Sequence, residues 1–303
     1  MEAPLEITFN ATNGTSLAGT VALPKAAGPH PAVLLCQGLS GVRHLVLPEV
    51  AAHLAGAGYA SLRFDYSGCG DSGGVRGWVD PQQRVRDAMS ALAILAARTD
   101  VDASRLGVYG HSYGGPVAIH VAAQDERVRA LATVSTPGNG REMLRAPRPA
   151  WDWLALKQRL DEERAAIAAG QPPTVVGIEE IFPFSPAFAA KYAELKAKDG
   201  GTSAIAAGTG LGVSQFYLAS VDLMAAFDPQ GAARGLTHCP TLLVDGAADD
   251  TAPIETVQPV YRAIPGPKSW IILDDADHNS LDTEPGLGKA LGHVVGWFNQ
   301  HLA

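Results

Sequence analysis

The chain has 303 residues, with 23 Lys and Arg against 31 Asp and Glu, so its formal net charge is −8. Apolar residues make up 47% and charged residues 18%, which is typical of a globular protein and outside the range of disordered chains. An acidic chain without a Lys/Arg cluster is poorly suited to bind nucleic acid. At about 100–200 residues per domain, the length allows one large domain or two small ones.

Three cysteines, Cys36, Cys69 and Cys239, are an odd number without CxxC spacing. Neither a disulfide framework nor a structural zinc site is therefore predicted. The first residues lack the basic and apolar regions of a secretory signal, and no apolar stretch reaches the roughly 20 residues of a membrane span. We expect a soluble, cytoplasmic protein.

The first half of the chain opens with two predicted strands, 5–10 and 15–23, around an Asn-Gly dipeptide typical of a tight hairpin turn. Short apolar strands then alternate with helices. The predicted strands are 32–36, 59–64, 106–109 and 128–134, and the predicted helices are 48–57, 81–98 and 112–123. Pro81 suits the first turn of its helix, and Asp80 suits the N-cap. This alternation predicts βαβ units and a parallel sheet covered by helices on both faces.

The alternation stops between residues 137 and 229. Helical periodicity over 151–169 and 186–198 occupies part of this region. Strand–helix order returns with strands 240–245 and 270–274 and helices 253–264 and 284–301. We predict an α/β core formed by 1–136 and 230–303. Residues 137–229 are predicted to be a helical cap, too poor in strands to be a second sheet domain.

A G-x-S-x-G pattern at Gly110, Ser112 and Gly114 lies between a predicted strand and a predicted helix, the context that this motif requires. The serine must adopt unfavourable backbone angles to lift its hydroxyl above the sheet edge. Flanking glycines remove the Cβ atoms that would clash in such a turn. The start of the helix directs free N–H groups and a positive dipole end at the position where an oxyanion would form.

A serine hydroxyl needs a base and an orienting acid, which should follow in the order Ser, acid, His after late strands. Asp249 comes after strand 240–245, and His278 comes after strand 270–274. We predict Ser112 as the nucleophile, His278 as the base and Asp249 as the acid. The neighbouring carboxylates Asp250 and Asp245 remain alternatives for the acid.

This order of motifs resembles the α/β-hydrolase fold superfamily over essentially the whole chain outside the cap. The likeness lies in five segments: the elbow GHSYGG (110–115), the lead-in DASRL (102–106), the acid loop (246–253), Asp277-His278, and a glycine-rich turn (64–72) with Ser67 where arginine is usual. Within the superfamily, the chain resembles serine esterases of the dienelactone-hydrolase and cocaine-esterase-like groups that carry a helical lid.

The resemblance implies two backbone N–H donors for the oxyanion. One is Leu39, after Gln37-Gly38, where the family has His-Gly; the other is Tyr113, directly after the nucleophile. The implied reaction is hydrolysis of a small-molecule ester, lactone or thioester, without metal or organic cofactor. An amidase or peptidase, an acyltransferase or a C–C bond hydrolase can use the same triad. No nucleic-acid or membrane partner is expected, and a homodimer is left open.

Some features favour structural roles over chemistry. The run 68–73 fits G-x-G-x-x-G, but no helix can follow it at once, so a dinucleotide site is not predicted. Cys69 is expected to be a buried small hydrophobe and His111 a packing residue. The cap aromatics should seat the cap on the core, with one or two lining an acyl or alcohol pocket. They are Trp151, Trp153, Phe182, Phe184, Phe188, Tyr192, Phe216 and Tyr217.

Overall fold

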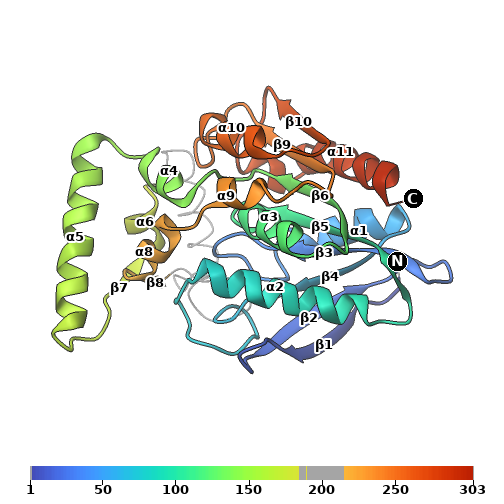
Figure 1. The fold of residues 1–303 in the computed structure, drawn as a ribbon, viewed down its shortest axis with the longest axis horizontal. Helices are drawn as coiled ribbons and strands as arrows, with labels where there is room; N and C mark the ends of the chain where they lie inside the picture. Colours follow the sequence, from blue (N-terminus) through green and yellow to red (C-terminus); the bar gives the residue numbers. More distant parts are fainter. Residues whose placement is uncertain (1, 184–188, 190–214, 303) are drawn as a thin grey trace.

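The computed structural model describes residues 2–183, 189 and 215–302 (Figure 1). Its main element is an eight-stranded sheet in the order β1-β2-β4-β3-β5-β6-β9-β10. The strands are β1 (Leu5–Asn10), β2 (Ser16–Ala22), β3 (His30–Cys36), β4 (Ala60–Phe64), β5 (Val101–His111), β6 (Val128–Val134), β9 (Thr241–Gly246) and β10 (Lys268–Leu273). Strand β2 pairs antiparallel with β1 and β4, and the remaining neighbours pair parallel. The predicted parallel sheet, extended by an N-terminal hairpin, is confirmed.

Helices cover both faces of this sheet because successive strand residues point to opposite sides. In β3, Leu34 packs into one apolar core, whereas Val33 and Leu35 pack into the other. The first core lies under α2 (Pro81–Ala96), α3 (Gly114–Gln124) and α10 (Ile254–Ala263), and the second lies under α1 (Leu47–Gly56) and α11 (Gly286–His301). The short α9 (Pro229–Ala233) lies against α3 and α10.

The element boundaries differ from the predicted ones in a few places. Asp80 caps α2 as expected, accepting the N–H groups of Gln82 and Gln83 at 2.9 and 3.2 Å. Strand β5 is longer than 106–109 because its N-terminal part continues past a register irregularity beside β3. Helix α3 begins at Gly114 rather than at residue 112, because residues 112 and 113 form the turn that leads into it.

The region between β6 and α9 contains a strand pair that was not predicted. Its described helices are α4 (Gly140–Arg145), α5 (Ala150–Ala168), α6 (Ile178–Ile181) and α8 (Ser220–Ala225). Strands β7 (Val175–Gly177) and β8 (Gln215–Tyr217) form a separate antiparallel pair. The region predicted to be a helical cap therefore contains, among its described residues, these helices and one short strand pair. Three residues per strand are too few to give a readable alternation.

These elements lie together at one end of the molecule, at the left of Figure 1, with α5 farthest from the sheet. The predicted helix 186–198 falls outside the described residues, apart from residue 189. The cap bounds 137–229 stay a prediction. Among the described helices, none combines the length and the apolar character that crossing a membrane would require.

Candidate active site

Ser112 occupies a strained turn between β5 and α3. Its φ of 50° lies in the left-handed region that is unfavourable for residues other than glycine. The turn is held by hydrogen bonds from the Ser112 N–H to the Val134 oxygen at 2.9 Å and from the Gly115 N–H to the Ser112 oxygen at 2.8 Å. A Cβ on Gly110 would lie 2.6 Å from the Gly114 oxygen. The tight turn therefore requires the glycines of the motif, as predicted.

Three residues from distant parts of the sequence meet at this turn. The Oγ of Ser112 lies 2.9 Å from Nε2 of His278, and Nδ1 of His278 lies 2.8 Å from Oδ2 of Asp249. The other carboxylate oxygen of Asp249 accepts the N–H groups of Thr251 and Ala252 at 2.9 and 2.7 Å. The structure therefore brings together the three predicted residues, and two backbone donors fix the orientation of the carboxylate.

The two alternative acids do not bond to the histidine. Asp250 is exposed, and its carboxylate lies 3.4 Å from the Thr251 hydroxyl. Asp245 is buried and accepts the Thr136 N–H and the Trp270 indole N–H, both at 2.8 Å. Burial raises the pKa of Asp245 to about 7. Of the three carboxylates, only Asp249 is placed to orient the His278 ring.

The environment of His278 favours its protonated form. Burial by itself lowers the pKa of the imidazole, because a charge is costly away from water. The hydrogen bond and the negative charge of Asp249 act in the opposite direction, together with the charges of Asp282 and Asp245. The pKa of His278 is therefore raised above its ordinary value of 6.5.

The predicted oxyanion donors lie beside Ser112. A Cβ built on Gly38 would be 3.3 Å from the Ser112 Cβ, so the end of β3 approaches the nucleophile closely. Leu39 and Tyr113 line one cavity together with Ser112. Within the described part of the chain, no acceptor takes the backbone N–H of Leu39 or Tyr113. Both groups are thus available to an oxygen bound above the serine.

Gln37, which stands where the family has histidine, bonds within its own loop. Its buried side chain accepts the Gly38 N–H at 2.7 Å through Oε1. Its Nε2 donates to the Val42 and Leu45 oxygens at 3.0 and 2.5 Å. The glutamine therefore ties the two ends of residues 37–45 together, so the loop keeps a defined shape without the histidine.

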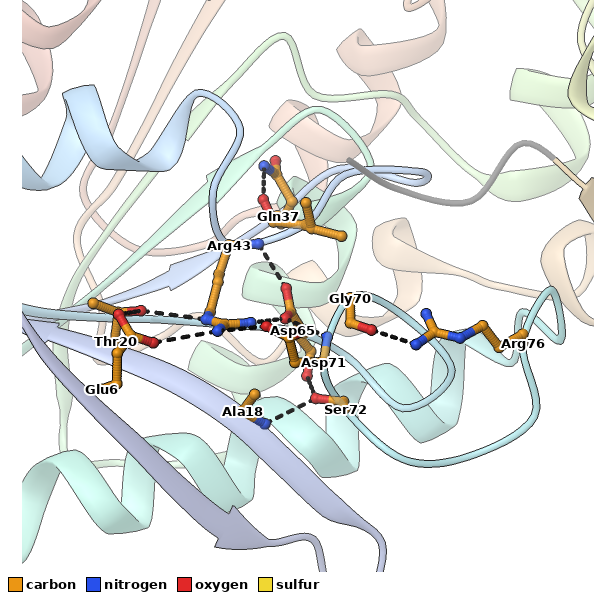
Figure 2. Close-up of polar contacts among 11 residues, drawn as sticks. Glu6, Ala18, Thr20, Gln37, Arg43, Asp65, Gly70, Asp71, Ser72 and Arg76 are labelled. Atoms are coloured by element: carbon orange, nitrogen blue, oxygen red, sulfur yellow. Dashed lines mark hydrogen bonds and ion pairs between the residues drawn. The ribbon is translucent and has the colours of Figure 1, made fainter. Parts of the chain in front are cut away.

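Arg43 on the same loop forms a buried ion pair that the sequence did not reveal (Figure 2). Its backbone N–H donates to Asp65 Oδ1 at 2.7 Å, and its guanidinium bonds to the other oxygen of the same carboxylate. Asp71 and Glu6 lie 2.7 and 3.2 Å from the guanidinium. Arg43 and Asp65 are 22 residues apart and lie on different loops, so no local sequence pattern signals this pair.

The glycine-rich turn itself is structural. Gly68 and Gly70 have φ values of 80° and 49°, which favour glycine, and helix α2 begins only at Pro81. The Ser72 hydroxyl donates to the backbone carbonyl oxygen of Asp65 at 2.6 Å. No helix therefore follows the run 68–73 directly, because α2 begins eight residues after Gly73.

A cavity of about 410 Å³ opens above Ser112. Its apolar lining comes from residues 39–46, from the region between β6 and α8, and from the loop after β9; these residues are Leu39, Leu45, Val46, Pro137, Met143, Pro147, Ile178, Phe182, Pro183 and Ala252. Asp250 and Asp282 also line it, whereas no Lys or Arg does so among the described residues. The described part of the chain has no group of three or more His, Cys, Asp or Glu placed to hold a metal ion.

The cap aromatics have different environments. Phe182 lines the cavity, Phe216 is buried, and Trp151 is 72% exposed. Phe184, Phe188 and Tyr192 lie outside the described residues. His111 is buried as expected, and it also borders the cavity, with Nε2 2.9 Å from Asp282 Oδ1.

Known proteins resemble this chain in sequence and in fold. The family model described as X-Pro dipeptidyl-peptidase (S15 family) matches residues 13–280. An uncharacterized 31.7 kDa protein from the traX-finO intergenic region of Escherichia coli is 24% identical over 293 residues, covering 94% of this chain and 96% of that protein. Thiohydrolase aneE of Aspergillus aculeatus is 27% identical over 286 residues, covering 91% and 86%. The crystal structure of the alpha/beta hydrolase GrgF from Penicillium sp. sh18 matches with a TM-score of 0.81 at 18% identity, over 99% of both chains. The predicted fold class is confirmed.

Proposed function

Because the chain belongs to the X-Pro dipeptidyl-peptidase (S15) family and is an α/β hydrolase, we propose that it cleaves a carboxylic ester, lactone or thioester through an acyl-enzyme on Ser112. The observation that carries this proposal is the hydrogen-bonded chain from Ser112 through His278 to Asp249, at 2.9 and 2.8 Å. Such a chain gives a weak hydroxyl nucleophile its base and gives the base its orienting acid.

In the proposed reaction, Ser112 Oγ attacks the substrate carbonyl carbon while His278 Nε2 takes the hydroxyl proton. The N–H groups of Leu39 and Tyr113 bind the oxyanion of the tetrahedral intermediate. His278 then gives the proton to the leaving alcohol or thiol as the bond to the carbonyl carbon breaks. Water, deprotonated by His278, attacks the acyl-enzyme in the second half, and the proton returns to Ser112. Asp249 holds the ring tautomer and stabilises the imidazolium.

The cavity supports a neutral acyl group as the substrate. Its volume of about 410 Å³ falls within the range of small-molecule pockets. Its described lining is largely apolar, and its charged members Asp250 and Asp282 would repel an anionic acyl chain. The relative named thiohydrolase supports a thioester among the three bond types.

A second candidate is cleavage of an amide bond, because the family model carries the description X-Pro dipeptidyl-peptidase. The same triad can perform this reaction with an amine as the leaving group. Bond preference therefore has to be measured, with ester and peptide probes on one preparation.

The test combines labelling with a substrate panel. We expect a fluorophosphonate to add one mass equivalent to the protein and none to S112A, and kcat of S112A to fall toward roughly 10⁶-fold below the parent. The panel contains a p-nitrophenyl ester, a lactone, an acyl N-acetylcysteamine thioester and an X-Pro p-nitroanilide. Retained turnover in S112A would reject this nucleophile, and activity on the anilide alone would favour the peptidase.

A further inference from the structure

Arg84 is a buried cation directly behind the loop that carries Leu39. It lies on α2 and is 3% exposed. Its Nη1 donates to the Gly38 oxygen at 3.2 Å, and its Nη2 donates to the Leu39 oxygen at 2.6 Å. The two acceptors are successive carbonyls of the loop, so one guanidinium fixes two neighbouring peptide planes.

Among the described residues, the other groups in contact with Arg84 are two aromatic rings and a thiol. The guanidinium carbon lies 4.8 Å from the centre of the Tyr66 ring and 5.8 Å from that of the Tyr113 ring, and Nη2 lies 3.8 Å from Cys69 Sγ. Within residues 2–183 and 215–302, no carboxylate comes within 4.0 Å of its side-chain nitrogens. A buried charge is costly without compensation. Here carbonyl dipoles and aromatic faces provide it, so the positive charge is directed at the loop.

The geometry of a peptide unit links this contact to the oxyanion site. A trans peptide is planar, and its C=O and N–H point in opposite directions. The Gly38 carbonyl and the Leu39 N–H belong to the same peptide unit. Because Arg84 binds the carbonyl on one side, the N–H is directed to the other side. Gly38 lies against Ser112 on the cavity side, where its Cβ would be 3.7 Å from Oγ.

The positive charge also has an electronic effect. A carbonyl that accepts a bond from a cation becomes more polarised, and the N–H of the same unit becomes a stronger donor. The effect matters most when negative charge develops on the substrate oxygen, which happens in the transition state and much less in the bound substrate.

We propose that Arg84 is a positioning residue that orients and polarises the Gly38–Leu39 peptide, so that its N–H stabilises the oxyanion. This inference rests on the proposed serine-hydrolase function. It predicts that Arg84 contributes to kcat and little to KM, because the charge acts on an interaction that is strongest in the transition state.

The experiment uses R84A, R84Q and R84K, with R86A as the matched control. Arg86 is on the same helix, but its side chain is 49% exposed and faces Asp80. With the best ester of the panel, we expect R84A to lower kcat by about 10- to 100-fold with KM changed less than about twofold. R84K should keep more of kcat than R84Q, and R86A should match the parent.

Two further readouts separate positioning from a structural role. The affinity of a trifluoromethyl ketone, which forms the tetrahedral adduct, should fall in R84A by about the same factor as kcat/KM. Arg84 also borders a second cavity of about 260 Å³, and we expect a small cation to reach the vacated position from it. Guanidinium at millimolar concentration should therefore raise kcat of R84A, whereas sodium at equal ionic strength should not.

The inference is overturned if folded R84A keeps kcat within about twofold of the parent, or if its kcat falls while its affinity for the ketone is unchanged. Unfolding of all three Arg84 variants, judged by circular dichroism, would also overturn it, because Arg84 would then be a core residue. The S112A variant distinguishes a failure of the proposed function from a failure of the role of Arg84 alone. An active S112A refutes the proposed function, whereas an inactive S112A with an unimpaired R84A refutes only the role of Arg84.

Discussion

The substitution D249N should inactivate the enzyme, because it changes which ring nitrogen of His278 carries the proton. One oxygen of Asp249 accepts the Thr251 and Ala252 N–H groups at 2.9 and 2.7 Å, so the carbonyl oxygen of asparagine would take that place. Its NH₂ group would then face His278 Nδ1, which must accept the hydrogen bond. The ring proton would then be on Nε2, the nitrogen that lies 2.9 Å from the Ser112 Oγ. The imidazole could no longer take the serine proton.

The expected size of this effect follows from the tautomer. For the same substitution in a Ser-His-Asp triad, kcat falls by about 10⁴-fold with the geometry preserved. At 1.36 kcal/mol for each factor of ten, this is about 5 kcal/mol of transition-state stabilisation. KM should change little, because Asp249 does not line the cavity. The melting temperature should also change little, because asparagine keeps both backbone hydrogen bonds.

The assay is steady-state hydrolysis of the preferred ester by D249N and by the control D250N, with circular dichroism to verify folding. Asp250 is exposed and its carboxylate contacts the Thr251 hydroxyl at 3.4 Å, so D250N should stay within about threefold of the parent. A folded D249N with more than about a tenth of the parental kcat would refute the tautomer argument, and so would an equal loss in D250N.

Three other changes test the same structure. The value of kcat/KM should rise with pH, with a midpoint above 6.5. The reason is that the raised pKa of His278 keeps its ring protonated to higher pH, and a protonated ring cannot act as a base. A midpoint at or below 6.5 contradicts this. R43M should lower the free energy of unfolding in urea by about 3–5 kcal/mol, because the buried Asp65 carboxylate loses its cation and keeps only backbone N–H donors; a loss below about 1 kcal/mol contradicts this. G114A should reduce the melting temperature strongly, because the added Cβ would lie 2.1 Å from a carbonyl oxygen of β3. The control G292A on α11 should leave the melting temperature unchanged or raise it, because its added Cβ would meet no atom within 4 Å. Similar effects of the two variants would contradict the packing argument.

Features that depend on neighbours in the sequence could be predicted well. The hairpin, the alternation of strands and helices, and the Asp80 cap all follow from patterns a few residues long. The elbow was predictable because its turn needs glycines at fixed offsets from Ser112. The order of the three site residues then followed from strand ends meeting at one edge of a parallel sheet.

Features that depend on distant partners could not be predicted in the same way. Three carboxylates follow or end β9, and only the folded acid loop shows that Asp249, and not Asp245 or Asp250, bonds to His278. Strands β7 and β8 could not be predicted, because each is only three residues long and its partner lies in a separate part of the sequence. Which cap residues reach the cavity is likewise a property of packing, which sequence periodicity does not encode.

The loop of residues 37–45, which carries Leu39, departs from the superfamily pattern at Gln37. Gln37 stands in place of the usual histidine and bonds to carbonyls of the same loop, and Arg43 ties the loop to the buried Asp65 carboxylate. Arg84 on α2 also binds this loop, by donating to the Gly38 and Leu39 carbonyl oxygens. Three polar side chains, two from the loop itself and one from α2, thus fix the loop before any substrate is bound. A donor fixed in this way stabilises a developing oxyanion without reorganisation, which is the condition under which a backbone N–H contributes most to catalysis.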